Sequence, residues 1–274
     1  MKTSAEQTTS RVRAFLWMAG FLVALAGIQL FVFPEQTERF FAWTIDPPLT
    51  AAFLGACYWS SVVLEWSAAR TRTWAGARIA IPTVLVFTVL TLGVTLLHLD
   101  RFHLGPEFEF ATRLVTWVWI AIYTLVPILL VVLLIGHARS RQPDPSRWDH
   151  LPTWVRALVM VQAVVFLLGG LVLLVAPESA AAWWPWSLTA LTGRAIGAWV
   201  ISLGVIAAHA LWEDDKERVR PAAYSYLTLA ILETVALVRF PGDFAWTTLS
   251  GWVYLVFLAS AVVVGAAVLW GRPR

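Results

Sequence analysis

The ionisable residue that lies deepest within an apolar stretch of the sequence is Glu233, near the middle of the stretch 221–239. A charged side chain inside the hydrocarbon of a membrane is costly, which makes it a candidate for function. Arg194 stands near the start of the apolar stretch 192–211, and an Arg side chain can extend along a helix toward a partner. We predict an ion pair between Glu233 and Arg194, with Arg113 as the competing partner. The pair would either tie two helices together or form a solute or proton site in a transporter.

Two further titratable residues, Glu65 and His209, stand close to the C-terminal ends of two apolar stretches. Glu65 can reach Arg70 or Arg72, and His209 can meet Glu213 one helical turn later. We expect both residues to form solvated pairs at the inner membrane surface, because pairs of this kind are common there and contribute little to stability.

The five histidines and the single cysteine give little support to a metal or cofactor site. Haem ligation by two histidines needs both on facing helices at one depth, whereas only His98 and His103 share the outer side. The segment 100–109 contains an Asp, a His and two Glu, but their spacing matches no defined cation motif. Cys57 lies in an apolar run, as a packing residue would, and the run 213–218 is expected to be a hydrated turn. The sequence therefore predicts no cofactor, no metal and no catalytic residue, and it favours a function other than catalysis.

The elements that carry these residues must lie in a membrane. Only 14% of the 274 residues are charged, against roughly 25% in a soluble domain, and the mean hydropathy is +0.72. The net charge of +3 is too small to indicate nucleic acid as a partner. We expect an all-α integral membrane protein with eight transmembrane helices, each long enough to cross a bilayer, at about 13–33, 50–68, 77–98, 113–136, 154–176, 192–211, 221–239 and 248–270.

The basic residues predict the orientation of these helices. Of the 20 Lys and Arg, 15 fall in alternate connecting segments, which include both ends of the chain. Basic residues in short loops mark the cytoplasmic side, so both termini are expected in the cytoplasm. The basic residues comprise 18 Arg and only 2 Lys, a bias typical of GC-rich bacterial genomes. We therefore expect a multi-pass protein of a bacterial plasma membrane.

The two halves of the sequence match each other at an offset near 143, which predicts a tandem duplication. The predicted parts are a cytoplasmic tail 1–12, a first four-helix repeat 13–137, a cytoplasmic linker 138–153 and a second four-helix repeat 154–271. Because each repeat has an even number of spans, the two are parallel and related by an axis along the membrane normal. Small residues at matching positions predict close contacts between helices, as at Gly55 and Gly197.

An aromatic cluster follows Pro-Glu in each repeat, in the outer loop between the first and second spans. Its tryptophans are Trp43 in the first repeat and Trp183, Trp184 and Trp186 in the second. These side chains are expected to plug the mouth of the bundle or to lie among the lipid headgroups, and we favour both over a ligand site.

These outer loops also carry a resemblance to a known family. The pattern of Pro-Glu, aromatic-x-Trp, Pro-Leu-Thr and Gly-Ala, with the later His98-Leu-Asp-Arg-Phe102, resembles uncharacterised bacterial multi-pass membrane proteins, mostly actinobacterial. The resemblance implies a multi-pass membrane protein but no activity, and no site residue can be carried over from it.

Two functions compete at this point. The first is a non-catalytic membrane module that contacts lipid, a membrane protein partner or a second copy of itself, and the scarcity of polar residues within the spans favours it. The second is a transporter or channel for a small solute or ion, with a path between the two repeats, and the duplication favours it. A water-accessible cavity lined by Glu233 would support transport, whereas a dry environment for Glu233 would support the module.

Overall fold

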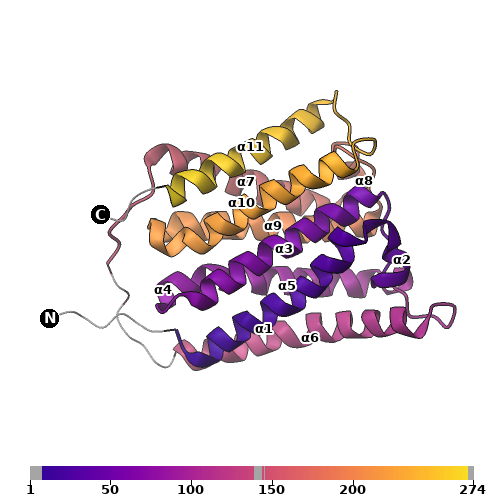
Figure 1. Ribbon diagram of the computed structural model, residues 1–274, viewed down its shortest axis with the longest axis horizontal. Helices are drawn as coiled ribbons and strands as arrows, with labels where there is room; N and C mark the ends of the chain where they lie inside the picture. Colours follow the sequence, from indigo (N-terminus) through magenta and orange to yellow (C-terminus); the bar gives the residue numbers. More distant parts are fainter. Residues whose placement is uncertain (1–7, 139–143, 145, 271–274) are drawn as a thin grey trace.

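A computed structural model of the chain describes residues 8–138, 144 and 146–270. The described residues form helices and connecting segments and contain no strand. The long helices run side by side in a single bundle (Figure 1). Their bounds are α1 Ser10–Gly27, α3 Pro48–Arg70, α5 Ile81–Leu97, α6 Phe110–Ala138, α7 Thr153–Val175, α9 Ala190–Glu213, α10 Lys216–Arg239 and α11 Leu249–Leu269.

Short helices connect several of the long ones. Their bounds are α2 Thr37–Phe40, α4 Trp74–Ala77 and α8 Pro177–Ala181. One turn of π-helix, Ile28–Val32, extends α1. Three-residue 3₁₀ turns lie before α2 at Pro34–Gln36, before α5 at Arg78–Ala80 and after α5 at Leu99–Arg101. Residues 1–7 of the predicted tail, residues 139–143 and 145 of the predicted linker, and residue 271 lie outside the described residues.

Seven of the helices in the described chain are long and apolar enough to cross a membrane, so the protein is a multi-pass membrane protein by length and composition. The remaining predicted span, 50–68, corresponds to α3, a helix of 23 residues without a stretch as apolar as those of the other seven. The reason is its position, because 17 of its 23 residues are buried among other helices. A helix that contacts protein on all sides does not need an apolar surface for lipid.

The two ends of the bundle have different structures (Figure 1). The start of α7 and the ends of α6 and α11 lie at one end, which we call the linker end. The short helices α2 and α8 lie at the other, which we call the α8 end. There, the backbone leaves the helical conformation at Phe33 and Ala176, each of which precedes a proline. The predicted outer loops therefore begin where the sequence pattern placed them.

Close contacts through glycine fix the pairing of α1 with α3 and of α7 with α9. A Cβ atom added to Gly55 would lie 2.5 Å from the backbone nitrogen of Phe31, and one added to Gly197 would lie 3.0 Å from that of Leu174. No side chain fits at Gly55 without a shift of the backbone, so the predicted close contacts at both glycines are confirmed.

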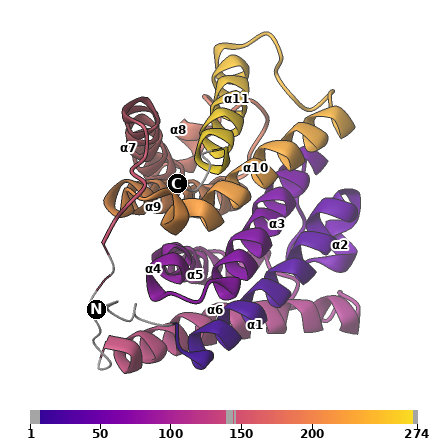
Figure 2. The same ribbon diagram turned by 60° about the vertical axis from the view of Figure 1, so that its left-hand side comes forward.

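The centre of the bundle is formed by α3, α5, α9 and α10, with α1 and α6 on one side and α7 and α11 on the other (Figure 2). The helix α3 packs along α10, and α5 packs along α9. Residues 8–138, which we call the N-terminal half, thus contact residues 146–270, the C-terminal half, through two pairs of central helices. The candidate residues lie in and around this central layer.

Candidate functional site

Glu233 is buried between α3, α10 and α11, with 1% of its surface exposed. The hydroxyl of Tyr254 donates a hydrogen bond to its Oε2 at 2.9 Å, and the thiol of Cys57 lies 4.0 Å from its Oε1. The ion pair expected with Arg194 is not formed, and neither is one with Arg113, whose buried Nε has no hydrogen-bond partner among the described residues. Glu233 therefore fixes the ring of Tyr254 on α11 against α3 and α10.

Arg194 makes its polar contacts with α7 and with the N-terminal half instead. Its Nε donates to the carbonyl oxygen of Leu174 at 3.1 Å, and its Nη1 donates to Nε2 of His98 at 2.9 Å. A guanidinium group only donates hydrogen bonds, so Nε2 of His98 carries no proton in this contact. Burial, and next the charge of Arg194, lowers the pKa of His98 below its usual range.

His103, in the loop after α5, is also held in its neutral form. Its Nδ1 donates to the carbonyl oxygen of Phe41 at 2.9 Å, and its Nε2 accepts from the hydroxyl of Thr44 at 3.0 Å. Burial lowers the pKa of this histidine as well. Among the described residues no group of three or more His, Cys, Asp or Glu is placed to hold a metal ion.

The lowered pKa values of His98 and His103 predict a loss of stability in acid. The unfolded chain takes up protons below a pH of about 6.5, while the folded protein takes them up only at lower pH. Stability is therefore fully present above this value and decreases as the pH falls below it. We expect the midpoint of thermal unfolding in detergent to fall between about pH 7.5 and pH 5, and to fall less in the double variant His98→Gln, His103→Gln. An equal fall in both proteins would contradict this account.

Glu65 lies in a different environment from the one expected at the sequence level. It has 1% of its surface exposed and is not a solvated residue at the membrane surface. Ser61 donates to its Oε1 at 3.1 Å, and its Oε2 has no hydrogen-bond partner in the structure. The expected partner Arg70 places its guanidinium over the ring of Trp17 instead, 5.1 Å from the ring centre. The sequence places Glu65 near Arg70, but the side chain of Glu65 points into the bundle, where α1, α5 and α6 enclose it.

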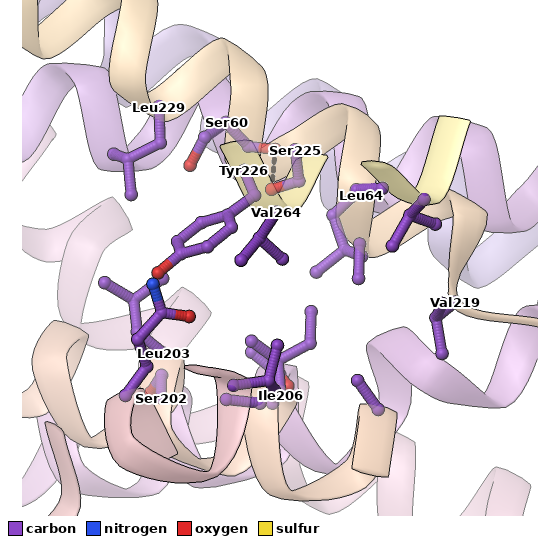
Figure 3. Close-up of a pocket in the computed structure, with 18 of the residues that line it drawn as sticks. Ser60, Leu64, Ser202, Leu203, Ile206, Val219, Ser225, Tyr226, Leu229 and Val264 are labelled. Atoms are coloured by element: carbon purple, nitrogen blue, oxygen red, sulfur yellow. Dashed lines mark hydrogen bonds between the residues drawn. The ribbon is translucent and has the colours of Figure 1, made fainter. Parts of the chain in front are cut away.

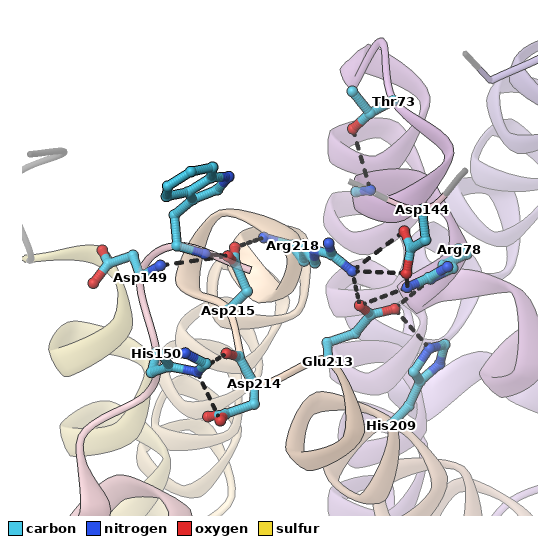
Figure 4. Close-up of polar contacts among 12 residues, drawn as sticks. Thr73, Arg78, Asp144, Asp149, His150, His209, Glu213, Asp214, Asp215 and Arg218 are labelled. Atoms are coloured by element: carbon cyan, nitrogen blue, oxygen red, sulfur yellow. Dashed lines mark hydrogen bonds and ion pairs between the residues drawn. The ribbon is translucent and has the colours of Figure 1, made fainter. Parts of the chain in front are cut away.

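His209 meets Glu213 as predicted, with 3.2 Å between Nε2 and Oε1. The pair is not solvated, because Glu213 is fully buried and the side chain of His209 is 10% exposed. Asp215 and Arg218 are buried as well, each 5% exposed. The run 213–218 is therefore no hydrated turn. Instead, Glu213 is the centre of a polar cluster at the linker end (Figure 4).

The contacts of Glu213 join the two halves of the chain. Arg78, from the N-terminal half, bonds both oxygens of the carboxylate, and Arg218 donates to Oε2 at 3.0 Å. Asp144, from the connecting segment, accepts from Arg78 at 2.9 Å and from Arg218 at 3.2 Å. Two positive and two negative groups thus balance each other around the buried Glu213, while the side chain of Asp144 is 43% exposed. We call Arg78, Asp144, His209, Glu213 and Arg218 the linker-end cluster.

The tryptophans of the outer loops divide into buried and exposed members. Trp43 is 3% and Trp186 is 4% exposed, so both lie inside the α8 end of the bundle, as a plug would. The indole of Trp186 donates to Oγ1 of Thr50 at 3.0 Å and so connects the two halves. Trp183 is 77% exposed, as expected for a side chain among headgroups.

Trp183 and Trp184 also line a large pocket in the side of the C-terminal half, which we call the lateral pocket. Its volume is about 560 Å³, and its walls come from α7, α8 and the segment after it, α9, α10 and α11, with Phe53 of α3. The wall residues are mostly apolar and include six aromatic side chains, those of Phe53, Phe166, Trp183, Trp184, Tyr254 and Phe257. The ring of Tyr254 that Glu233 holds is thus part of the wall.

Comparisons with models of known protein families, with curated proteins and with solved structures find no match for this chain. Its function is therefore argued from the geometry described above.

The linker-end cluster and the lateral pocket were both missed at the sequence level. A signal for the cluster was present, because Glu213 is followed by two further acids and stands one turn after His209. Its partner Arg78 lies 135 residues away, however, and only the packing of α9 against the start of α5 brings the two together. The pocket left no signal, because its residues come from six separate segments.

Proposed function

We propose that this protein is a membrane-embedded module that binds an acyl chain of a membrane lipid in the lateral pocket. The observation that carries the proposal is the pocket itself. Its volume of about 560 Å³ falls within the range of about 300–1,000 Å³ that is usual for small-molecule sites. Its predominantly apolar, aromatic wall suits a hydrocarbon chain and offers no charged group to a polar solute.

The surroundings of the pocket favour lipid as the source of that chain. Val172 on α7 is 49% exposed, and Leu249 and Val253 on α11 are 73% and 58% exposed. A membrane-spanning helix presents such apolar side chains to lipid. The pocket therefore opens where acyl chains surround the protein. At its α8 end it carries the small polar side chains of Ser179 and Ser250, with Trp183 beside them.

The proposal includes eight membrane crossings, with α3 as the second. The polypeptide leaves α1 at the α8 end and enters α4 at the linker end, and α3 is the helix that connects them (Figure 1). Its 23 residues correspond to about 35 Å at 1.5 Å per residue, which is sufficient to cross the hydrocarbon of a bilayer.

The proposal also includes a duplication of four helices, with repeats 13–137 and 154–271. Contacts recur at positions related by the predicted offset. A Cβ on Gly27 would meet Trp59, and one on Gly170 would meet Ile201 at the matching position. The rings of Trp43 and Trp119 lie 5.1 Å apart, and those of Trp186 and Tyr254 lie 5.4 Å apart. The packing of α3 along α10 and of α9 along α5 is what a twofold relation between the repeats would produce.

The orientation remains a proposal that rests on the basic residues of the sequence. With the linker end in the cytoplasm, both termini are cytoplasmic and the lateral pocket lies in the outer half of the bilayer. The composition favours a bacterial plasma membrane as the location.

The structure gives less support to a transporter. A cavity of about 80 Å³ does lie between the two halves, but neither Glu233 nor Arg194 lines it. Glu233 is buried against Tyr254 and Cys57 and lines neither this cavity nor the lateral pocket. Its environment is therefore the dry one that favours the membrane module.

Photolabelling tests the lipid proposal directly. The protein would be placed in vesicles of phosphatidylglycerol and phosphatidylethanolamine that include a phospholipid with a diazirine in one acyl chain. After illumination, the labelled residues would be mapped by mass spectrometry. We expect label on Phe166 and Tyr254, which are 9% and 7% exposed but line the lateral pocket.

Trp119 provides a matched control, because it is buried to a similar extent, at 6% exposed, and lines neither the lateral pocket nor the cavity between the two halves. Lipid around the whole protein will label exposed residues such as Leu96 and Leu125 in any case. If Phe166 and Tyr254 were labelled no more than Trp119, the pocket would not hold an acyl chain.

A further inference from the structure

Glu65 lines a small chamber inside the N-terminal half. The chamber has a volume of about 30 Å³ and is enclosed by α1, α3, α5, α6 and Trp199 of α9. Glu65 and Thr83 both line it, and Oε2 of Glu65 and Oγ1 of Thr83 are buried without a hydrogen-bond partner among the described residues. One water molecule needs about 10–15 Å³ of such volume and two or more polar partners. The chamber therefore has the size and the polar groups to hold one or two water molecules.

The chamber adjoins the larger cavity between the two halves. Ser61, Thr83 and Trp199 line both spaces. The larger cavity has a volume of about 80 Å³ and extends along α10 from Leu229, near the middle of the bundle, to Val219 at the linker end (Figure 3). The side chain of Tyr226 projects into it from α10, and the hydroxyl of this tyrosine has no hydrogen-bond partner in the part of the chain that the structure describes. The cavity thus joins the chamber to the linker end, with its polar side chains near the chamber and apolar side chains from there to Val219.

The charge balance around Glu65 favours its protonated form. The lining of the chamber contains no Arg, Lys or His, and Tyr123 of α6 is its only other titratable side chain. The hydroxyl of Tyr123 is 2.6 Å from that of Tyr58 and is therefore engaged. A buried carboxylate with a single neutral donor and no cation is costly, and such a group becomes neutral by binding a proton.

We propose that Glu65 is a proton-binding site in contact with water, and that it exchanges its proton with the linker end through the cavity between the two halves. The proton leaves Oε2 for a water molecule in the chamber, giving a carboxylate and a hydronium ion, and returns by the reverse step. Glu233 differs from Glu65 in its contacts and in its access to a cavity. Its carboxyl group accepts a hydrogen bond from Tyr254, and it lines none of the three cavities. The site is independent of the lipid proposed for the lateral pocket.

Infrared spectroscopy of the purified protein tests this site through the C=O stretching band of protonated carboxyl groups. The sample is transferred from H₂O to D₂O, and the deuterium shift of the band is followed in time. The variant Glu65→Gln assigns the component that belongs to Glu65, and Glu233→Gln assigns the one that belongs to Glu233. We expect the Glu65 component to shift at least about tenfold faster than any Glu233 component, because exchange of a dry buried group requires local opening of the protein.

Two results would overturn the proposal. One is the absence of any C=O component that Glu65→Gln removes, since the group would then be ionised. The other is a Glu65 component that exchanges as slowly as that of Glu233.

The variant Thr83→Val keeps Glu65 and removes a polar group that lines both cavities, so it tests the route of exchange even if Glu65→Gln fails to fold. We expect it to slow the exchange of Glu65, and an unchanged rate would exclude the proposed route.

Discussion

Replacement of Glu213 by Gln should lower the free energy of unfolding by about 3–5 kcal/mol, the usual effect of removing one partner from a buried ion pair. Glu213 is fully buried and bonds both Arg78 and Arg218, whose side chains are 12% and 6% exposed. Without its charge, Asp144 would be the only carboxylate left in the linker-end cluster for two buried guanidinium groups. The measurement is the midpoint of denaturant or thermal unfolding in detergent micelles.

Glu217→Gln is the matched control for this variant. Glu217 also pairs with an arginine, Arg220, at 2.7 Å, but its side chain is 61% exposed. Exposed pairs of this kind contribute less than about 1 kcal/mol. If the two variants were destabilised equally, burial of the linker-end cluster would not be what holds the two halves together at this end.

Much of the architecture could be predicted from the sequence, because the bilayer imposes a simple requirement. A helix that faces lipid must be apolar along about 20 residues, and the predicted apolar stretches coincide with the helices to within a few residues. The helix α3 satisfies this rule least well, since it is covered by protein and can include Ser60, Ser61 and Glu65. The breaks before Pro34 and Pro177 could be predicted for a local reason, the restriction on the residue that precedes a proline.

The partners of the charged residues could not be predicted in the same way. Helical rise gives the depth of a side chain in the membrane, and it places Arg194 near enough to the depth of Glu233 for an extended Arg side chain to reach it. It does not give the direction in which each side chain points after the helices have packed. Glu233 points toward α3 and α11, whereas Arg194 reaches back to α7 and across to His98, 96 residues away in the sequence.

The environment of Glu65 could not be predicted either. Two arginines within seven residues suggested solvated pairing, because neighbours in the sequence are the only partners that a sequence reveals. The chamber that encloses Glu65 is formed by helices that begin as far away as Ser10 and Phe110. Only His209 met its predicted partner, since a contact one turn along the same helix depends on local geometry alone.

Gly169→Phe should abolish most of the lipid binding that we propose for the lateral pocket. Gly169 lines the pocket, and a Cβ added there would have no described atom within 4 Å. A phenylalanine can therefore be accommodated by the protein, with its ring in the volume that an acyl chain would take. We expect the fraction of protein with bound lipid to fall at least about tenfold, equivalent to about 1.4 kcal/mol of binding free energy.

Gly93→Phe is the control with the same chemical change. Gly93 is also an exposed glycine within a long helix, α5, and has no described atom within 4 Å of an added Cβ, but it does not line the pocket. Both variants add one aromatic ring to the lipid-facing surface. A difference between them in bound lipid therefore reports on the pocket rather than on surface hydrophobicity.

Native mass spectrometry of the three proteins, released from detergent under the same conditions, tests the central claim most directly. We predict that the wild-type protein and Gly93→Phe retain the added mass of a membrane lipid and that Gly169→Phe does not. Retention of the same lipid by Gly169→Phe at the wild-type level, or the absence of bound lipid from the wild-type protein, would contradict the assignment of the lateral pocket as a lipid site.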